Sequence, residues 1–233
     1  MRFTVALIRH GKTKGNIEHR YTGCRTDEDL DLIGINEINE RLDRIKAAVG
    51  NPEAANFYSS PMIRCIHTLK LIFGDREYSV VNDFREIDFG VFENHNYDEL
   101  NGRSDYQAWI DSNGTMDYPE GEKRESFIER NITAFYHILE TEYNRVCVSN
   151  DFKISNIENK LDNGTDKNDD TKDQTGIVIV CHGGTIMSIL SYITGKDYYD
   201  FQIENAGGFC LSIDYDEGRY SRDRIVIEEI RSI

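Results

Sequence analysis

The chain has 233 residues with a formal net charge of −15 at pH 7, and 39% of its residues are hydrophobic. This length and composition can supply one large domain with a well-packed core. The acidic balance argues against a general binder of nucleic acid or of anionic membranes, so an anionic ligand would need locally placed positive charge.

The N-terminal part of the chain alternates strand-like and helix-like patterns. "FTVALI" (3–8) is a short apolar, β-branched run that predicts a buried strand, and "ANFYSS" (55–60) predicts a second one. Between them, apolar residues recur at helical spacing, and Gly50 and Pro52 end the helix. The apolar face of this helix consists of Ile35, Ile38, Leu42, Ile45 and Val49.

The middle of the chain begins with a second helix, for which Ser60 is a suitable N-cap and Pro61 a suitable first residue. A third strand is predicted at 78–81, followed by a long loop. Residues 123–143 then predict a further helix. Its expected core face carries Ile128, Ile132, Phe135 and Leu139.

Residues 149–175 differ in composition from the rest of the chain. They are rich in Asp, Glu, Lys and Asn and show no sustained periodicity, which predicts an acidic, flexible insertion. A regulatory or docking loop is the alternative, without a specific motif behind it. Ile154, Ile157 and Leu161 could form one short helix within the segment.

The C-terminal part starts with "GIVIVCHGG" (176–184), the most apolar of the predicted strands. A helix is predicted from Thr185 to Thr194, and two strands at 208–215 and 224–230 close the chain. The alternation of strands and helices, without a proline-rich linker, predicts one α/β domain over residues 1–233.

Two of the predicted strands end in the same way, as "VALIRHG" and "VIVCHGG". In a mostly parallel α/β sheet the carboxyl ends of the strands share one edge, where ligands bind. We therefore expect His10 and His182 to meet at that edge. Gly11 lets the chain turn, so that Arg9 and His10 can both reach one pocket.

Arg64 adds positive charge to the same edge, because it lies in the first turns of the helix that follows the second strand. Arginine forks, imidazoles and free helix amides are the groups that bind a phosphoryl group. The sequence has neither a GxxxxGK[ST] loop nor an evident magnesium-binding carboxylate cluster beside these residues, which argues against nucleoside-triphosphate chemistry.

Each of these residues also has a plain structural interpretation. A buried histidine is more often structural than catalytic, and Arg64 could be a solvated helix residue. Cys181, next to His182, is more often a core residue than a metal ligand or a thiol nucleophile. The phosphate-site interpretation therefore depends on the set and not on any one residue.

The five cysteines are scattered, odd in number and without a CxxC pair. This pattern indicates free thiols in a reducing compartment and no zinc site. The N-terminal apolar run, about six residues long, is too short for a signal-peptide core or a membrane span. We therefore expect a cytoplasmic protein with no metal site.

Four motifs occur in order along the chain: "RHG", "SSPMIRCIHT", "REIDFG" and "CHGG". This set resembles the histidine phosphatase superfamily, over nearly the whole chain except residues 149–175. The resemblance implies a three-layer α/β sandwich of the phosphoglycerate-mutase-like type, with a mostly parallel central sheet and helices on both faces. It implies no cofactor.

The resemblance also implies a role for each motif residue. His10 matches the nucleophile that becomes a phosphohistidine, His182 the histidine that stabilises charge on the transferred group, and Glu86 the proton donor. An unprotonated imidazole is a good nucleophile near neutral pH. The structural alternative for Glu86 is a surface salt bridge with Arg85.

Other residues match positions that bind the substrate. The family's phosphate-binding positions correspond to Arg9, Asn16, Arg64 and Gly183. Thr22 and Gly23 are expected to contact the substrate. Substrate choice is expected to depend on the segment 92–118, on the insertion and on four residues near the site, Tyr21, Thr22, Cys24 and Arg25. Lys12 and Arg25 could bind a second anionic group or could be solvated surface charges.

Two departures from the mutase pattern favour the phosphatase branch. Gly15 stands where mutases of this type carry Trp, and "REIDFG" replaces their "ERHYG". "REIDFGVFE" and "YPEGEKRESFIER" are similar to α-ribazole phosphatases and broad-specificity phosphatases. The expected activity is metal-independent hydrolysis of a small phosphorylated metabolite.

Two further functions remain open on the sequence alone: a cofactor-dependent phosphoglycerate mutase and a non-catalytic module that binds a phosphorylated ligand. No nucleic-acid or membrane partner is expected, and a homodimer is possible.

Overall fold

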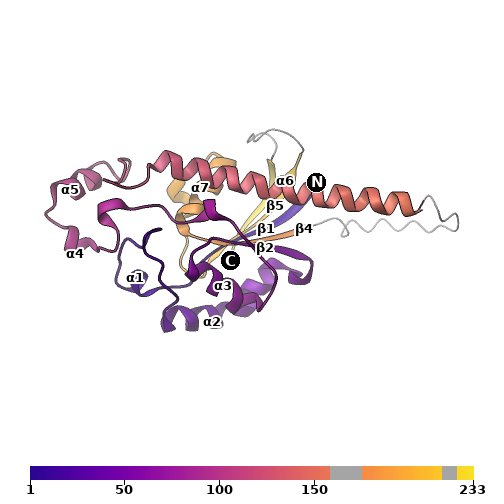
Figure 1. Cartoon of the computed structure of the whole chain (residues 1–233), viewed down its shortest axis with the longest axis horizontal. Coiled ribbons are helices and arrows are strands. Elements are labelled where there is room, and N and C mark those ends of the chain that lie inside the picture. Colours follow the sequence, from indigo (N-terminus) through magenta and orange to yellow (C-terminus); the bar gives the residue numbers. More distant parts are fainter. Residues whose placement is uncertain (158–174, 217–224) are drawn as a thin grey trace.

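A six-stranded sheet forms the centre of the part of the chain that the computed structural model describes, residues 1–157, 175–216 and 225–233 (Figure 1). The strands are β1 (Arg2–Arg9), β2 (Ala55–Ser59), β3 (Ser79–Val80), β4 (Thr175–Cys181), β5 (Gly208–Tyr215) and β6 (Ile225–Ser232). The α-helices are α1 (Lys14–Ile17), α2 (Leu32–Val49), α3 (Ile63–Phe73), α4 (Tyr97–Leu100), α5 (Ser104–Asp111), α6 (Arg124–Ile157) and α7 (Gly183–Thr194). Short 3₁₀ turns are η1 (Pro52–Ala54), η2 (Asn82–Phe84), η3 (Gly90–Phe92) and η4 (Tyr198–Phe201).

The strand order is β3-β2-β4-β1-β5-β6. β3, β2, β4 and β1 pair in parallel, whereas β5 pairs antiparallel with both β1 and β6. Of these six strands, β5 therefore runs opposite to the others. The prediction of a mostly parallel central sheet with helices on both faces is confirmed.

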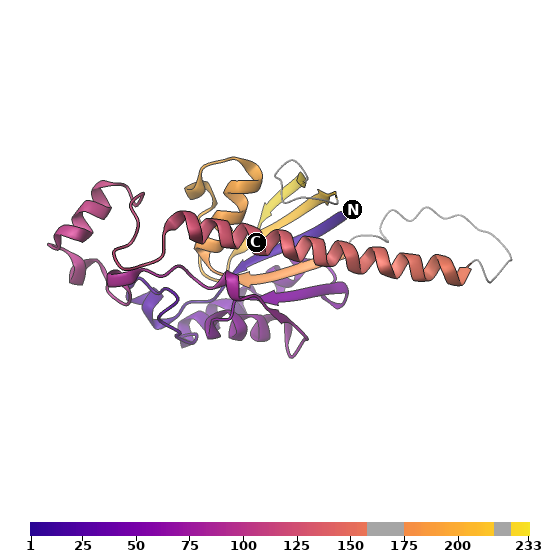
Figure 2. The same ribbon diagram turned by 45° about the horizontal axis from the view of Figure 1, so that its top comes forward.

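Side-chain alternation along β1 divides the core into two halves. Val5 and Leu7 pack with residues of α6 and α7, whereas Ala6 and Ile8 pack with residues of α2 and α3. Successive side chains of a strand point to opposite faces of its sheet, so one buried strand serves both halves. Figure 2 shows the same three layers from a second direction, with α6 and α7 on one side of the sheet and α2 and α3 on the other.

The helix after β2 begins later than the sequence predicts. α3 starts at Ile63 with Met62 as its N-cap, and no side chain caps it. The predicted cap, Ser60, has its hydroxyl 2.8 Å from Nε2 of His182 and accepts only a 3.3 Å hydrogen bond from the Met62 amide. The prediction of Ser60 as N-cap and Pro61 as first helical residue was wrong, because this hydroxyl is engaged at the sheet edge.

The helix predicted at 123–143 continues to Ile157, so residues 149–157 of the expected flexible insertion are helical. No Gly or Pro occurs between residues 144 and 157 to end it. In both ribbon views α6 runs well past the ends of the strands, so its last turns need no apolar face toward the core (Figures 1 and 2). Residues 158–174, with Leu161 and the rest of the predicted insertion, lie outside the described residues.

Of the predicted core face of α6, Phe135 and Leu139 are fully buried and Ile132 packs against the same cluster. In the described part of the chain, no helix is both long enough and apolar enough to cross a bilayer.

A small aromatic lobe lies to one side of the sheet, formed by η3, α4 and α5 at the left of Figure 1. Phe92, Leu100 and Tyr106 are its buried centre, and Tyr21, Phe89, Trp109 and Tyr118 pack around them. Ring centroids in this cluster lie 5.0–6.2 Å apart, mostly edge to face. The lobe lies next to the carboxyl ends of the parallel strands (Figure 1).

Candidate active site

Three neighbouring strands deliver polar side chains to one edge of the sheet. In the parallel register Arg9 of β1 lies opposite Cys181 of β4, and Ser59 of β2 opposite Val180. His10 and His182, the next residues of β1 and β4, are therefore at the same level, and Ser60, which follows Ser59, lies one position earlier. The rings of the two histidines lie 5.1 Å apart, edge to face. The predicted meeting of the two His-Gly strand ends is confirmed.

His10 is held in one tautomer by the backbone carbonyl of the next residue, Gly11. Its side chain is 3% exposed, and Nδ1 lies 2.7 Å from the carbonyl oxygen of Gly11. A carbonyl can only accept a hydrogen bond, so Nδ1 carries the proton and Nε2 keeps its lone pair. Burial, followed by the charges of Arg64 and Arg9, lowers the pKa of His10 well below 6.5. The ring is therefore neutral and nucleophilic.

Arg64 is fully buried, with 0% exposure, in the first turns of α3. Nη1 donates to the carbonyl oxygen of Thr26 at 2.8 Å and Nη2 to that of Gly23 at 3.2 Å, while Nε has no hydrogen-bond partner. Within the described residues no carboxylate lies within 4.0 Å of its guanidinium. A buried charge that is bonded only to neutral carbonyls lacks its counter-ion.

Arg9 likewise has no ion-pair partner among the described residues. Its Nη1 donates to the carbonyl oxygen of Ile203 at 2.6 Å, and its buried Nε is unbonded. A Cβ atom built on Gly183 would lie 3.4 Å from that Nε, so the guanidinium lies directly beside the first turn of α7. No side chain caps α7, and its first amide groups remain available to an anion.

Asn16 is oriented by neighbours that occupy its amide oxygen. Oδ1 accepts hydrogen bonds from the backbone amide of Thr13 at 3.1 Å and from Nδ2 of Asn205 at 3.2 Å. Nδ2 of Asn205 also donates to the carbonyl oxygen of His10 at 3.1 Å. Nδ2 of Asn16 is thereby left as the donor of a side chain that Asn205 links to the His10 backbone.

His182, the second histidine, is fully buried between Ser60 and Cys65. Its Nε2 lies 2.8 Å from the Ser60 hydroxyl and 3.6 Å from Sγ of Cys65. Burial lowers the pKa of His182 well below 6.5, and the charge of Arg64 lowers it further. His182 is thus a neutral hydrogen-bonding group at the N-terminus of α7.

Glu86 lies inside the site and not on the surface. Its side chain is 12% exposed, and Oε2 lies 3.8 Å from Nδ1 of His182. Oε1 accepts the amide hydrogen of Ile87 at 2.9 Å. Burial raises the pKa of Glu86, although this amide and the charges of Arg64 and Arg9 act against the shift. Arg85 instead lies near Asp83 and Glu122, so the surface ion pair considered for Glu86 does not form.

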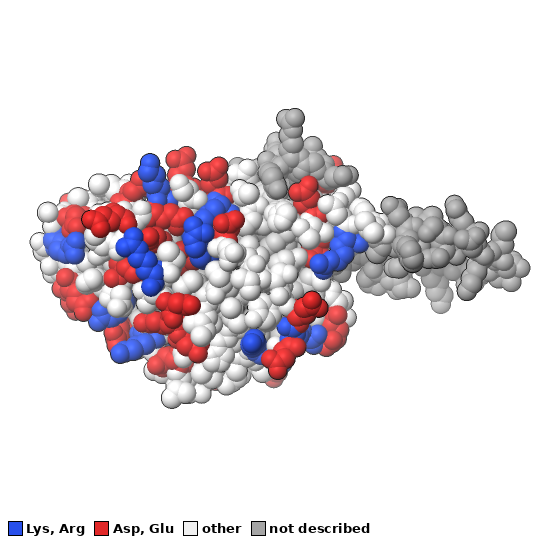
Figure 3. All heavy atoms as spheres, in the orientation of Figure 1, with Lys and Arg blue, Asp and Glu red and all other residues white. Residues whose placement is uncertain are grey.

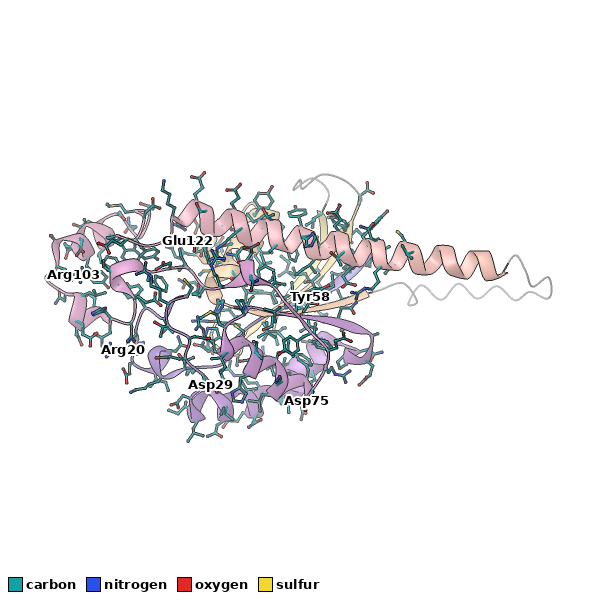
Figure 4. All side chains as sticks on the ribbon, viewed as in Figure 1. Arg20, Asp29, Tyr58, Asp75, Arg103 and Glu122 are labelled. Atoms are coloured by element: carbon teal, nitrogen blue, oxygen red, sulfur yellow. The ribbon has the colours of Figure 1, made fainter. Side chains whose placement is uncertain are left out.

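Arg130 of α6 holds the loop that carries Glu86. It donates to the carbonyl oxygens of Asp83, Arg85 and Glu86, and it forms a two-point ion pair with Glu122 at 2.7 and 2.8 Å. Glu122 lies just before the start of α6 (Figure 4). This clamp fixes the position of the Glu86 backbone.

Of the two residues expected to contact substrate, Thr22 keeps a hydrogen-bonding group available to a ligand and Gly23 does not. The Gly23 amide donates to Oε1 of Glu93 at 2.9 Å, and its carbonyl accepts from Arg64, so Gly23 positions the arginine. The Thr22 hydroxyl makes only a 3.4 Å hydrogen bond to the carbonyl oxygen of Arg20. Thr22 is half-buried and can still act as a donor to a ligand.

Lys12 and Arg25, considered for a second anionic group, are already paired. Nζ of Lys12 lies 2.6 Å from Oε1 of Glu37, and Nε of Arg25 lies 2.8 Å from Oδ1 of Asp88. On the face shown in Figure 3, lysine and arginine side chains likewise lie among aspartate and glutamate. Neither residue is therefore a free cation at the site.

A pocket of about 620 Å³ opens beside these groups. Its lining includes the polar or charged groups of Arg9, Glu86, Gly183 and Arg124 and the aromatic rings of Trp109, Tyr118 and Tyr198. The predicted segment 92–118 thus contributes two aromatic rings. A small molecule can reach the phosphate-binding groups between a polar base and an aromatic wall.

Four positioning residues were missed by sequence reasoning: Ser60, Thr68, Arg130 and Asn205. Ser60 had a visible signal, since it belongs to the "SSP" motif, but was interpreted as a helix cap. Thr68 accepts the Gly11 amide hydrogen at 3.0 Å and lies one helical turn after Arg64, a spacing that could have indicated it. Asn205 and Arg130 contact the site through long-range packing, for which the local sequence carries no signal.

Metal-ligand clusters of three or more His, Cys, Asp or Glu residues do not occur among the residues that the structure describes. All five cysteines are free thiols. Cys181 is a buried strand residue whose pKa burial raises well above 9.0, which fits the predicted core role.

Comparison with known proteins matches this geometry to one family. The model of the histidine phosphatase superfamily (branch 1) matches residues 5–157, more than half of the chain. The "Probable phosphoglycerate mutase GpmB" of Proteus mirabilis is 32% identical over 124 residues, which are 51% of this chain and 54% of the relative. The chain thus matches about half the length of this relative.

Solved structures match over almost the whole chain. A phosphoserine phosphatase of Entamoeba histolytica, in complex with 3-phosphoglyceric acid, is 26% identical with a TM-score of 0.61, over 99% of this chain and 98% of that one. The α-ribazole phosphatase of Shigella flexneri shares the fold at 22% identity, with a TM-score of 0.62 over 93% and 92% of the two chains.

Proposed function

The chain belongs to the histidine phosphatase superfamily, whose members here include phosphatases and phosphoglycerate mutases, and we propose that it is a phosphomonoester hydrolase. The proposed reaction proceeds through a phosphohistidine at His10. The substrate is a small phosphorylated metabolite, reached through the pocket described above.

The observation that supports this proposal most strongly is a pair of arginines without ion-pair partners, Arg64 fully buried and Arg9 half-buried. Arg64 and Arg9 each keep an unbonded, buried Nε atom beside the neutral imidazole of His10. A phosphate group supplies the missing negative charge and several acceptor oxygens at once. An imidazole lone pair next to a bound phosphate is the arrangement that phosphoryl transfer to histidine requires.

In the first step Nε2 of His10 attacks phosphorus. The P–N bond forms as the P–O bond to the leaving group breaks, and the proton of Glu86 passes to the leaving oxygen. The negative charge on the equatorial oxygens is stabilised by Arg9, Arg64, the side-chain Nδ2 of Asn16 and the first backbone amides of α7. The hydrogen bond from Nδ1 to Gly11 stabilises the positive charge that develops on the ring.

In the second step water attacks phosphorus. Its proton passes to the Glu86 carboxylate, the P–N bond breaks, and inorganic phosphate leaves with His10 neutral again. Glu86 therefore acts first as an acid and then as a base. The raised pKa of Glu86 supports this assignment, because a carboxyl group must be partly protonated at working pH to act as an acid.

Hydrolysis is proposed over the mutase reaction for two reasons. The likeness to a phosphatase at 26% identity extends over 99% of the chain, whereas the mutase relative matches about half of it. The mutase Trp and "ERHYG" segments are also absent from the sequence. A non-catalytic binding module is less consistent with a site that keeps the nucleophile, the acid and both arginines.

The same proposal includes a cytoplasmic, metal-independent enzyme. It also includes the expectations that the enzyme binds no nucleic acid or membrane and could form a homodimer. The free thiols support a reducing compartment.

A phosphate-release assay with 4-nitrophenyl phosphate and a panel of phosphomonoesters tests the function. We expect kcat/KM to differ strongly across the panel, and His10→Ala to remove turnover for every member. Release by His10→Ala at the wild-type rate would exclude the proposed mechanism.

A further inference from the structure

Arg124, the first residue of α6, lines the same pocket as Arg9 and Glu86. Trp109 and Tyr118 line this pocket as well. The mechanism above gives it no role.

The contacts of Arg124 hold its guanidinium in place without neutralising it. Its Cζ atom lies 4.6 Å from the ring centroid of Tyr198 and 5.5 Å from that of Tyr199. Nη1 makes a long hydrogen bond of 3.4 Å to the carbonyl oxygen of Gly114. The carboxylate of Asp117 accepts the backbone amide of Arg124 and is not an ion-pair partner of its guanidinium.

The lack of an ion pair is unusual in this chain, which carries 42 acidic residues against 27 Lys and Arg residues. In the described parts of the chain, four arginines make no ion pair with a carboxylate: Arg9, Arg44, Arg64 and Arg124. Arg44 is an exposed residue of α2, and Arg9 and Arg64 form the phosphate site. Glu204, the other acidic residue at the mouth of the pocket, is 80% exposed and pairs with Arg41.

From these contacts we infer that Arg124 binds a second anionic group of the substrate, located on its leaving group. This inference rests on the proposed function and extends it. That group is a carboxylate or a second phosphate, both of which accept the two parallel donors of a guanidinium. The aromatic rings keep the guanidinium ordered before the substrate arrives, which reduces the entropy cost of binding. The preferred substrate is therefore a small phosphomonoester with two anionic ends.

The test compares substrates that differ only in the second anion, using the full-length wild type and Arg124→Gln. 3-Phosphoglycerate and glycerol 3-phosphate differ by a carboxylate, and fructose 1,6-bisphosphate and fructose 6-phosphate by a phosphate. Wild type is expected to prefer the member with the second anionic group, in one pair, by about 10- to 100-fold in kcat/KM, the range for a charge-assisted hydrogen bond. Arg124→Gln should remove that preference and leave kcat/KM for the member with a single phosphate group within about twofold.

Two variants serve as controls. Arg124→Lys keeps the positive charge but lacks the two parallel N–H donors of a guanidinium, so it should restore part of the preference for the second anionic group. Arg2→Gln removes an exposed arginine that pairs with Asp214 of β5, outside the pocket, and should change neither ratio.

The substrate pair for which Arg124→Gln loses the wild-type preference shows whether the second anion is a carboxylate or a phosphate. Unchanged ratios in Arg124→Gln, or an equal loss for all substrates including 4-nitrophenyl phosphate, would overturn the inference while leaving the hydrolase proposal intact. A wild type that hydrolyses none of the substrates, 4-nitrophenyl phosphate included, would overturn both.

Discussion

Nδ1 of His10 donates a hydrogen bond to the carbonyl oxygen of Gly11 over 2.7 Å. This contact decides which ring nitrogen can react, because it fixes the proton on Nδ1 and leaves the lone pair on Nε2. The acceptor belongs to the glycine that directly follows the nucleophile in the sequence. The local sequence Arg-His-Gly thus supplies a phosphate-binding side chain, a nucleophile and the acceptor that orients that nucleophile.

Glu86→Gln should slow the enzyme according to the leaving group. A glutamine cannot donate a proton to the departing oxygen, so kcat/KM for an alkyl phosphate should fall by about 10²- to 10⁴-fold. 4-Nitrophenolate leaves readily without protonation, and its phosphate ester should lose far less. Steady-state assays with both substrates measure the difference, and equal losses would contradict the role of Glu86 as the acid.

The same carboxyl group should shape the pH profile of kcat/KM, which reports the steps up to phosphoenzyme formation. Neutral His10 is required, and its pKa is lowered, so the acid limb should lie well below pH 6.5. Protonated Glu86 is required, and its pKa is raised above 4.5, so activity should fall as pH rises through that pKa. With an alkyl phosphate, Glu86→Gln should abolish this alkaline limb. An alkaline limb that persists unchanged in the variant would assign it to another group.

Phosphate should stabilise the folded protein through Arg64. The wild type gains about 2.7 kcal/mol at a phosphate concentration of 100 times Kd, which raises Tm. Arg64→Met removes the uncompensated charge and should lose most of this shift. In the absence of phosphate it should cost less stability than Arg130→Met, which breaks the close ion pair with Glu122 and strands a carboxylate.

Thermal unfolding of the three proteins with and without phosphate measures both effects. A phosphate shift in Arg64→Met as large as in wild type would show that the anion binds elsewhere.

The enzyme should hydrolyse 3-phosphoglycerate and not isomerise it. With 3-phosphoglycerate and catalytic 2,3-bisphosphoglycerate, we expect inorganic phosphate to be the product and 2-phosphoglycerate to be negligible. A mutase must protect its phosphohistidine from water and pass the group to a second hydroxyl. Rapid interconversion of the two phosphoglycerates, with phosphate only a side product, would make the mutase assignment correct.

Removal of metal ions should leave the rate unchanged. The charge stabilisation in the proposed mechanism comes from Arg9, Arg64 and backbone amides, so dialysis against EDTA should not alter kcat/KM. Loss of turnover after dialysis, with recovery on adding magnesium, would contradict this mechanism.

The parts of the site that local sequence encodes were predictable. An apolar run ending in His-Gly defines both a strand and the position of its catalytic residue, so His10 and His182 were expected together before the β1–β4 pairing was known. Contacts that depend on distant segments were not predictable. Asn205 reaches His10 and Asn16 only because the segment before β5 returns beside β1.

Which charged side chains pair with one another could not be predicted from the sequence either. Lys12 and Arg25 were considered for a second anionic group and Arg124 was not, and only the folded chain brings Glu37 and Asp88 to the first two. The extent of α6 was also underestimated, because a helix that projects beyond the core needs no apolar periodicity.

The measurement that tests the account most directly is chemical trapping of the phosphoenzyme. Wild type and His10→Ala are mixed with a ³²P-labelled phosphomonoester, quenched rapidly under alkaline conditions and analysed by peptide mapping. We predict acid-labile phosphate on His10 in the wild type, none in the variant, and a loss of turnover in the variant of about 10³-fold or more with the fold retained by circular dichroism. Label on another residue, or wild-type turnover in His10→Ala, would contradict the central claim that His10 is the nucleophile.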